Sequence, residues 1–374
     1  MAVQLREVRS RRDLKRFVLF PFSLYKNNPY WVPPFIIDEL NTLRRDRNAA
    51  FRYCEAAYWL AWKDGRVVGR IAAIKNDRYI QKWGKAYARF GWIDFVDDRE
   101  VSEALLARVE EWARERGLVG VHGPMGFTDL DKEGMLIEGF DELGTLPMIY
   151  NHAYYPEHLE ALGYGKDVDW LEYEIKAPPE IPEKVLRVQE MVLKRSHLRL
   201  VEARRARDLR PYAREVFDVL NEAYADLYGV VELSEEQIEG YVKQYFSFIQ
   251  PDYAKVIVDD DNRVAAFGIG MPSLSRALQK SQGRLLPTGF IHILHALRNP
   301  QQLDLYLVAV RPKYQNLGVN SILMTEMTRA GLRNGIRSAE TSGELENNKA
   351  VQDFWKHYDK RQHKRRRCYV KLLA

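Results

Sequence analysis

The stretch that most constrains the fold runs from Leu303 to Gly335 and reads LDLYLVAVRPKYQNLGVNSILMTEMTRAGLRNG. Its first part alternates with the period of a β-strand, and Pro312 prevents that strand from continuing. A polar turn containing Gly318 follows, and then the apolar spacing of a helix that ends at Gly335. A strand that leads through a glycine turn into a helix presents free backbone amides and the positive end of the helix dipole. The stretch therefore predicts an anion site, such as one for phosphate, with an ordinary turn without a ligand as the alternative.

The order of predicted elements occurs twice along the chain. Hairpins are predicted around Asp64-Gly65 and around the polar turn at 260–262, and each is followed by strands and helices in the same order. A proline-rich segment, APPEIPEK, separates the two copies. The repeat predicts two domains, at 1–176 and 185–374, joined by a linker at 177–184.

Composition excludes several classes of protein. The chain has 374 residues, of which 46% are hydrophobic and 29% charged, as in a soluble globular protein. Its N-terminus is too charged for a signal peptide, so we expect a cytoplasmic protein. The two cysteines, Cys54 and Cys368, are far apart, which predicts no metal site. A net charge of +5 is too small to indicate a nucleic-acid partner.

The string VRPKYQNLGVNSIL resembles the acyl-CoA pyrophosphate loop of the GNAT (GCN5-related N-acetyltransferase) superfamily, in which Val-x-Pro-x-Tyr precedes Gln/Arg-x-x-Gly-x-Gly/Ala. Gln315, Gly318 and Asn320 fill the three loop positions, and Asn320 departs from the small residue usual there. The repeated element order is also that of GNAT domains, so the resemblance covers nearly the whole chain. It implies an α/β (α+β) protein of two tandem GNAT folds, each with a mixed, mostly antiparallel central sheet flanked by helices.

The first copy departs from the family where the coenzyme would bind. Its turn after the third strand reads VDDREVS, with three acidic residues and no glycine. Phosphate is not expected to bind there, because the turn itself carries negative charge. We therefore expect a degenerate first domain, and one coenzyme per chain.

The resemblance implies acyl-CoA as a cosubstrate, either acetyl-CoA or a long-chain thioester, without a bound prosthetic group. In the family, the strand before the loop pairs with the pantetheine arm, which here corresponds to Val308, Ala309 and Val310. Asn348 is a further candidate for the pantetheine side, with helix capping as the alternative. The loop residues expected to bind phosphate are Gln315, Asn316, Leu317, Gly318, Val319 and Asn320.

The resemblance also implies where a general base and a general acid would lie. Asp304 falls where histone-type members keep a catalytic glutamate, and Tyr306 shares its face; a solvated or ion-paired edge residue is the alternative. Glu340 on the next strand is a second candidate base, followed by Glu344 and Glu346. The acid is usually a tyrosine at the position of Trp355, so Tyr358, one turn later, is the candidate substitute.

Two further segments suggest an apolar substrate and a surface that binds anions. An insertion between the hairpin and Leu303 contains the helix TGFIHILHALRNP, whose broad apolar face favours a long acyl chain or a lipid acceptor. The run Lys360–Arg367, KRQHKRRR, favours a phosphate or peripheral contact with the inner membrane surface, with a solvated turn as the alternative and nucleic acid as the weakest reading.

Longer strings, among them GPMGFTDLDKEGMLIEGF and YYPEHLEALGY, are similar to a bacterial tandem-GNAT family related to bacterial ceramide synthases. The resemblance implies an acyl-CoA-dependent N-acyltransferase of lipid metabolism that acylates a primary amine, with a long-chain, sphingoid-base-like substrate favoured. A small-molecule N-acetyltransferase and a non-catalytic acyl-CoA- or lipid-binding protein are the alternatives. In this family the segment Asp129–Glu133 would face a groove shared by both domains.

Overall fold

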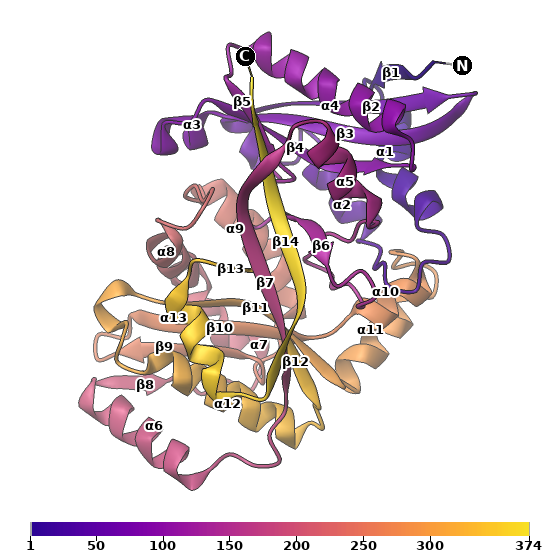
Figure 1. Ribbon diagram of the computed structural model, residues 1–374. Coiled ribbons are helices and arrows are strands. Elements are labelled where there is room, and N and C mark those ends of the chain that lie inside the picture. The colour runs from indigo at the N-terminus through magenta and orange to yellow at the C-terminus, as the bar shows by residue number, and fades with distance from the viewer. Residues whose placement is uncertain (1, 374) are drawn as a thin grey trace.

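The computed structural model describes residues 2–373 as a mixed α/β molecule in which one sheet passes through both halves of the chain (Figure 1). The strands follow the order β1-β2-β3-β4-β5-β14-β7-β12-β11-β10-β9-β8, with β6 beside β14 and β13 beside β7. The elements of the first half are β1 Gln4–Glu7, α1 Arg11–Leu24, α2 Ile36–Thr42, η1 Ala49–Arg52, β2 Cys54–Lys63, β3 Arg66–Asn76, α3 Asp77–Trp83, β4 Tyr87–Phe95, α4 Arg99–Arg114, β5 Gly120–Gly123, β6 Met135–Glu138, α5 Tyr154–Ala161 and β7 Gly165–Lys176.

The second half repeats this arrangement with additional helices. Its elements are α6 Glu183–Arg195, β8 Leu198–Leu200, α7 Ala206–Leu209, η2 Arg210–Tyr212, α8 Ala213–Tyr224, α9 Glu235–Tyr245, η3 Phe246–Phe248, β9 Ala254–Asp259, β10 Val264–Pro272, α10 Ser275–Ser281, α11 Gly289–Arg298, β11 Gln302–Val310, η4 Pro312–Tyr314, α12 Val319–Arg333, β12 Ser338–Thr341, β13 Glu344–Leu345, α13 Lys349–Phe354, η5 Trp355–His357 and β14 Lys360–Leu372.

Local sequence signals account for many of these boundaries. Asp64 and Gly65 both have positive φ and form the β2–β3 turn, as the Asp-Gly pair predicts. α9 begins with a capping box, in which the Ser234 side chain accepts from the amide of Gln237 and the Gln237 side chain accepts from the amide of Ser234. The segment 27–35 is irregular, as its prolines require, and α2 begins at Ile36 after Pro33 and Pro34.

The two halves exchange their central strands. β14, the last strand of the chain, pairs on one side with β5 and on the other with β7, both antiparallel. β7 in turn pairs with β12 of the second half, with Ala339 opposite Ile175. Figure 1 shows β7 and β14 running side by side through the centre of the molecule. Each half therefore completes its sheet with a strand from the other half.

Helices cover both faces of the second half's sheet. α8 and α9 pack on one face, where Val219, Leu220 and Phe267 are fully or almost fully buried. α12 packs on the other face against residues of β9 and β10, with Ile322 and Leu323 buried. β11 lies between these layers, so its two faces look toward different helices.

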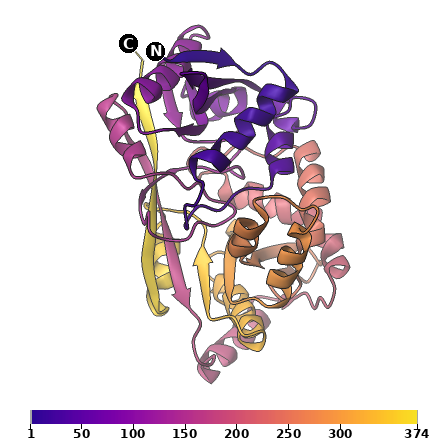
Figure 2. The same cartoon turned by 90° about the vertical axis from the view of Figure 1, so that its right-hand side faces the viewer.

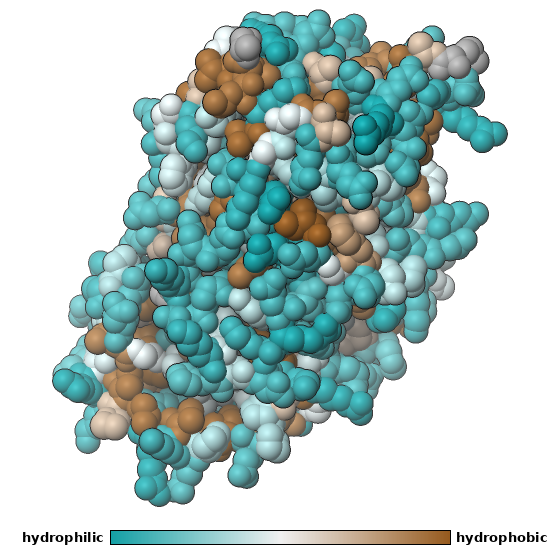
Figure 3. Space-filling view, in the orientation of Figure 1, coloured by the Kyte–Doolittle hydropathy of each residue, from teal (hydrophilic) through white to brown (hydrophobic). Residues whose placement is uncertain are grey.

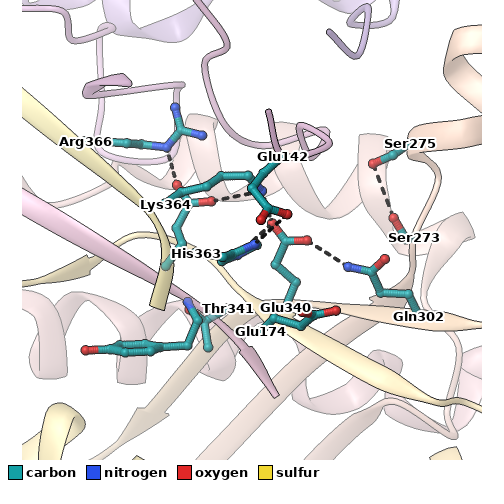
Figure 4. A network of polar contacts seen from close by, with 12 residues as sticks. Glu142, Glu174, Ser273, Ser275, Gln302, Glu340, Thr341, His363, Lys364 and Arg366 are labelled. Carbon is teal, nitrogen blue, oxygen red and sulfur yellow. Dashed lines mark hydrogen bonds and ion pairs between the residues drawn. The ribbon is translucent and has the colours of Figure 1, made fainter. Parts of the chain in front are cut away.

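The basic run at Lys360–Arg367 forms the first part of β14 rather than an exposed turn. Lys364 and Arg366 are each 1% exposed: the Lys364 ammonium contacts Glu340, and the Arg366 guanidinium contacts Glu172 (Figure 4). Arg367 pairs with Asp169 at 2.8 Å. These internal ion pairs weaken the basis for the phosphate or membrane-surface contact expected of this run, because all of its Lys and Arg side chains except Lys360, which lies over the Tyr173 ring, pair with carboxylates of the first half or of β12.

Among the described residues, no helix has both the length and the apolar character needed to cross a membrane.

The buried ion pairs predict a strong effect of Lys364 on stability. In Lys364→Met, Glu340 and Glu172 lose a buried cation, so we expect a loss of about 3 kcal/mol or more in the free energy of unfolding, measured by urea denaturation. Lys356→Met is the matched control, because Lys356 pairs with Asp353 at the surface with 66% of its side chain exposed, and no measurable change is expected. Equal behaviour of the two variants would contradict the role assigned to Lys364.

Candidate active site

The predicted anion loop lies at the surface and leaves the start of α12 uncapped. Gly318 has φ of +81° and occupies the N-cap position without a side-chain hydrogen bond to the helix. Arg311 anchors the beginning of the loop through Glu215, at 3.1 Å, and Tyr314 anchors its middle through Asp259, at 2.9 Å. A helix N-terminus without a capping side chain suits an anion. Of the predicted loop residues, Val319 is buried, and the rest are exposed: Gln315, Asn316, Leu317, Gly318 and Asn320.

Next to this loop, β11 has an open edge. Among the described residues, β12 pairs with β11 only from Gln302 to Leu305, and no strand flanks the remainder of β11 on that side. The Arg311 amide bonds to the Ala265 carbonyl in β10, so the backbone groups of Val310 and Val308 point toward the open edge. Ala309, between them, points its groups toward β10. This geometry fits a pantetheine arm that pairs with Val308 and Val310.

Side chains already bind the carbonyls of this edge. The Tyr224 hydroxyl, at the end of α8, donates to the Val308 carbonyl at 3.0 Å. The Gln315 amide donates to the Val310 carbonyl at 3.1 Å. Tyr224 was not among the predicted site residues, since a tyrosine late in an amphipathic helix carries no distinguishing signal.

A bulge in β11 places Tyr306 beside the open edge. Leu307 pairs with Ile269 and Leu305 with Gly270, so Tyr306 is the extra residue. Its buried hydroxyl has no hydrogen-bond partner among the described residues. Burial, together with the nearby Asp304, raises the pKa of Tyr306 well above its usual range.

Asp304 and Glu340 are cross-strand neighbours on β11 and β12. Asp304 is 2% exposed, and neither carboxyl oxygen makes a hydrogen bond of good geometry in the described part of the chain, although the nearby Ser273 side chain favours the carboxylate form. Burial and the neighbouring Glu340 raise the pKa of Asp304 well above its usual range. Asp304 is therefore neither solvated nor ion-paired, which were the alternatives to a catalytic role.

Glu340 is held by several partners (Figure 4). Its Oε1 contacts the Lys364 ammonium and lies 3.3 Å from His363 Nε2, and its Oε2 accepts from Gln302 at 2.7 Å. Burial raises the pKa of Glu340 to about 7, against the opposing effect of Lys364. Of the two carboxyl groups, Asp304 is thus the one with oxygens free for a substrate.

Glu344 lies on β13, which pairs with β7, and is held by the tryptophan that replaces the usual tyrosine. The indole Nε1 of Trp355 donates to Glu344 Oε1 at 2.7 Å, while the buried Oε2 has no partner among the described residues. Burial raises the pKa of Glu344 to about 7. Glu346, by contrast, pairs with Lys166 at 2.5 Å.

Two predicted site residues take other positions. Tyr358 packs with Trp355, Leu303 and Leu305 around a cavity of about 50 Å³, on the sheet face opposite to Asp304. Asn348 is the N-cap of α13, where its side chain accepts from the Val351 amide at 3.4 Å. The structure thus groups Asp304, Tyr306 and Glu340 and separates Tyr358 from them.

The first half has no comparable anion site at the corresponding turn. α4 begins directly after Asp98, whose carboxylate accepts from the amide of Glu100 and pairs with Lys63 at 2.6 Å. The position that phosphate would take is therefore filled by a carboxylate that the chain supplies itself.

A cavity of about 70 Å³ lies beside β4 in the first half. Arg70 and Asp94 form an ion pair at 2.7 Å in its wall. Lys132 also lines it, without a described hydrogen-bond or ion-pair partner in residues 2–373, and burial lowers the pKa of its ammonium. The chemistry of a ligand does not follow from this wall, because its cations and carboxylates balance.

The segment Asp129–Glu133 lies between the two halves. The Asp131 carboxylate accepts from the amides of Phe127, at 2.8 Å, and Thr128, at 3.1 Å, which stabilises the turn. The Thr128 hydroxyl lies 3.3 Å from the Tyr241 hydroxyl of α9. Burial raises the pKa values of Asp129 and Asp131 to about 6. The turn therefore joins the halves and keeps acidic groups inside.

Two clusters bring three potential metal ligands within 4.8 Å of one another in the described chain. In the cluster of His122, Asp167 and Cys368, the Tyr228 hydroxyl already bonds to all three side chains. In the cluster of Glu172, Glu340 and His363, the Lys364 ammonium contacts both carboxylates. A hydroxyl or an ammonium thus already contacts the potential ligands of each cluster, while His122 Nε2 and His363 Nε2 have no hydrogen-bond partner among the described residues.

Comparison with known proteins agrees with this geometry. Residues 215–358 match the family model described as "Acetyltransferase (GNAT) family". The tandem GNAT protein from the clavulanic acid biosynthesis pathway superposes with a TM-score of 0.56 at 14% identity, covering 99% of this chain and 98% of that one. A GCN5-related N-acetyltransferase from Sphaerobacter thermophilus gives a TM-score of 0.51 at 13% identity, covering 99% and 95%. The second half therefore matches the GNAT acetyltransferase family, and the chain as a whole has the fold of tandem GNAT proteins.

Two curated relatives align over almost the whole chain. Protein YghO of Escherichia coli (strain K12) is 29% identical over 371 residues, covering 97% of this chain and 94% of that protein. The bacterial ceramide synthase of Caulobacter vibrioides (strain NA1000 / CB15N) is 28% identical over 377 residues, covering 98% and 96%.

The exposed loop predicts that Gly318→Glu abolishes coenzyme binding in a folded protein. A carboxylate there would repel phosphate, so we expect at least about 100-fold weaker binding of coenzyme A in calorimetry. Gly335→Glu is a matched control, since Gly335 also has positive φ, of +77°, and open space around it, but lies at the other end of α12. Equal affinity in both variants would contradict the assignment of the loop.

Proposed function

We propose that this protein transfers an acyl group from acyl-CoA to the primary amine of a long-chain, sphingoid-base-like acceptor. The acyltransferase class follows from the fold and family match. The full-length similarity to the bacterial ceramide synthase, at 28% identity, carries the proposal of a lipid amine. The open edge of β11 and the uncapped α12 support acyl-CoA as the donor.

In the proposed reaction, the amine nitrogen attacks the thioester carbonyl, and the tetrahedral intermediate collapses to an amide and a thiolate. The arriving ammonium must first lose a proton. The ionised form of Asp304 has oxygens that can accept this proton, and its raised pKa makes the carboxylate a stronger base toward an ammonium. Of the neighbouring Glu340–Lys364 pair, the Glu340 charge raises the pKa of Asp304 and the Lys364 charge lowers it.

The departing thiolate must gain a proton. We assign this step to Glu344, whose pKa of about 7 keeps a useful fraction protonated at neutral pH. Trp355 cannot itself supply a proton at this pH, but its indole fixes the orientation of the Glu344 carboxyl group. Glu344 would thus take the part that a tyrosine has in many members of the family.

The substrate proposal is tested by incubating the protein with sphinganine and either palmitoyl-CoA or acetyl-CoA, and measuring the amide by mass spectrometry. The proposal expects N-acylsphinganine. A protein that acetylates only small polar amines would support the alternative of a small-molecule N-acetyltransferase. Coenzyme binding without any transfer would support a non-catalytic role.

The base assignment predicts different outcomes for the two neighbouring carboxyl groups. Asp304→Asn should lower kcat by about 100-fold or more, because the proton acceptor is lost. Glu340→Gln should keep activity and shift the acidic limb of the pH–rate profile to lower pH. The sign follows because the Glu340 charge raises the pKa of Asp304, and a base with a lower pKa is ionised at lower pH. Loss of activity only in Glu340→Gln would instead make Glu340 the base.

The acid assignment predicts a shift of the basic limb. The Trp355 hydrogen bond lowers the pKa of Glu344, because it favours the carboxylate. In Trp355→Phe the pKa of Glu344 should rise, so Glu344 stays protonated up to a higher pH. The basic limb of the pH–rate profile should therefore move upward by about one pH unit. Glu344→Gln, which removes the proton, should lower kcat by roughly tenfold or more. A basic limb that stays in place in both variants would contradict this role.

A further inference from the structure

The insertion between β10 and β11 forms a pair of short helices, α10 and α11, with apolar side chains on its outer surface. Leu286 is 76% exposed and Ile291 54%, and the nearby Phe290 and Leu294 are each 44% exposed. Phe290, Ile291 and Leu294 lie at helical spacing on one face of α11. The apolar face, which the sequence associates with a long acyl chain or a lipid acceptor, is thus exposed on the outside of the protein.

The outward face is not a consequence of loose packing. Ile293 on the inner side of α11 is 3% exposed and packs with Leu278 of α10, Val32 and Phe35. The Gln279 side chain donates to the carbonyls of Pro29 and Trp31, at 2.8 and 3.0 Å. The Gly283 carbonyl accepts from the Ile36 amide at 3.2 Å. The helix pair is therefore fixed on the body of the protein with its apolar residues presented to the outside.

The charges that the insertion itself carries all have one sign. No aspartate or glutamate occurs between Asp261 and Asp304. Between Pro272 and Gln302 the insertion carries four exposed cations, and none has an ion-pair partner among the described residues: Arg276, Lys280, Arg284 and Arg298. The cations of β14, by contrast, are matched by carboxylates.

The helix pair also lies close to the acceptor side of the site. It leaves the sheet at Pro272 and returns at Gln302, two residues before Asp304, and the Ser273 amide bonds to the Gln302 carbonyl at 2.9 Å. In Figure 2, α10 and α11 face the viewer below the helices of the first half. A surface that bound there would lie next to the end of β11 that carries Asp304.

We propose that α10 and α11 dock the protein on an anionic lipid bilayer, with Leu286, Phe290, Ile291 and Leu294 entering the interface and the four cations contacting acidic headgroups. An exposed apolar helix face flanked by unpaired cations has the character of an interfacial, non-spanning membrane element. The complementary charge favours such a surface over a second copy of this chain, whose own α10–α11 segment would bring like charges together.

This docking does not depend on the proposed acyl transfer. Vesicle binding is measured without acyl-CoA or amine, so a failure of either proposal leaves the other standing. If both hold, the bilayer would present a lipid amine next to the site.

The test is flotation of the full chain with vesicles of phosphatidylcholine alone or with about one third phosphatidylglycerol. We expect binding to the anionic vesicles that falls as salt screens the headgroups. The variant Phe290→Ser/Ile291→Ser/Leu294→Ser should bind at least about tenfold more weakly.

α6 provides the matched control. Val188 and Met191 are 44% and 59% exposed, and apolar side chains gather at the lower left of Figure 3, where Figure 1 places α6. This helix carries mixed charge, including the Arg187–Glu183 pair. The variant Val185→Ser/Val188→Ser/Met191→Ser should bind vesicles like the unaltered protein, and an equal loss in both triple variants would overturn the proposal.

A charge variant keeps the test decisive if the apolar variant fails to fold. Arg276→Glu/Arg284→Glu should weaken binding by roughly 25-fold or more, since each cation near an anionic surface contributes about fivefold. Arg187→Glu/Arg333→Glu makes the same change in net charge away from the helix pair and should have little effect. Absence of vesicle binding would overturn the proposal. So would a protein that does not bind vesicles but sediments as a dimer, if the triple α11 variant sediments as a monomer.

Discussion

The buried contact of Lys364 with Glu340 and Glu172 joins the elements on which the molecule depends. Lys364 comes from the last strand of the chain, Glu172 from the last strand of the first half, and Glu340 from the strand beside the proposed base. An unpaired charge at this depth would be costly, so the three strands must meet in one register. The exchange of β7 and β14 thus gives the site its charged wall as well as its support.

The two halves share a fold, but only the second half has the free helix N-terminus and the open strand edge that the proposed binding of coenzyme needs. In the second half, α12 begins without a capping side chain, and β11 continues beyond its neighbour β12. In the first half, Asp98 caps α4 with its own carboxylate. The first half instead contributes β7, the turn at Asp129–Glu133 and the surface on which α10 packs. Its retention in the chain therefore has a structural reason that is independent of catalysis.

The sequence predicted the parts of this structure that depend on local pattern. The tandem GNAT fold, the hairpins, and the strand, glycine turn and helix at Leu303–Gly335 are confirmed, because alternation and turn residues act within a few positions. The strand exchange was not predicted, because the residue pattern of a strand does not determine which other strand it pairs with. The run KRQHKRRR was interpreted as an exposed binding surface because the carboxylates that pair with it lie far away in the sequence. The bulge at Tyr306 likewise arises from pairing with β10.

The central claim is that the chain has one coenzyme site, built on β11 and α12. Hydrogen–deuterium exchange with and without coenzyme A tests it most directly, because free backbone amides become protected when they bind. With coenzyme A, we expect slower hydrogen–deuterium exchange of the amides at 308–321 and unchanged exchange at the corresponding segment of the first half, 94–101. Protection at 94–101, or none at 308–321, would contradict it.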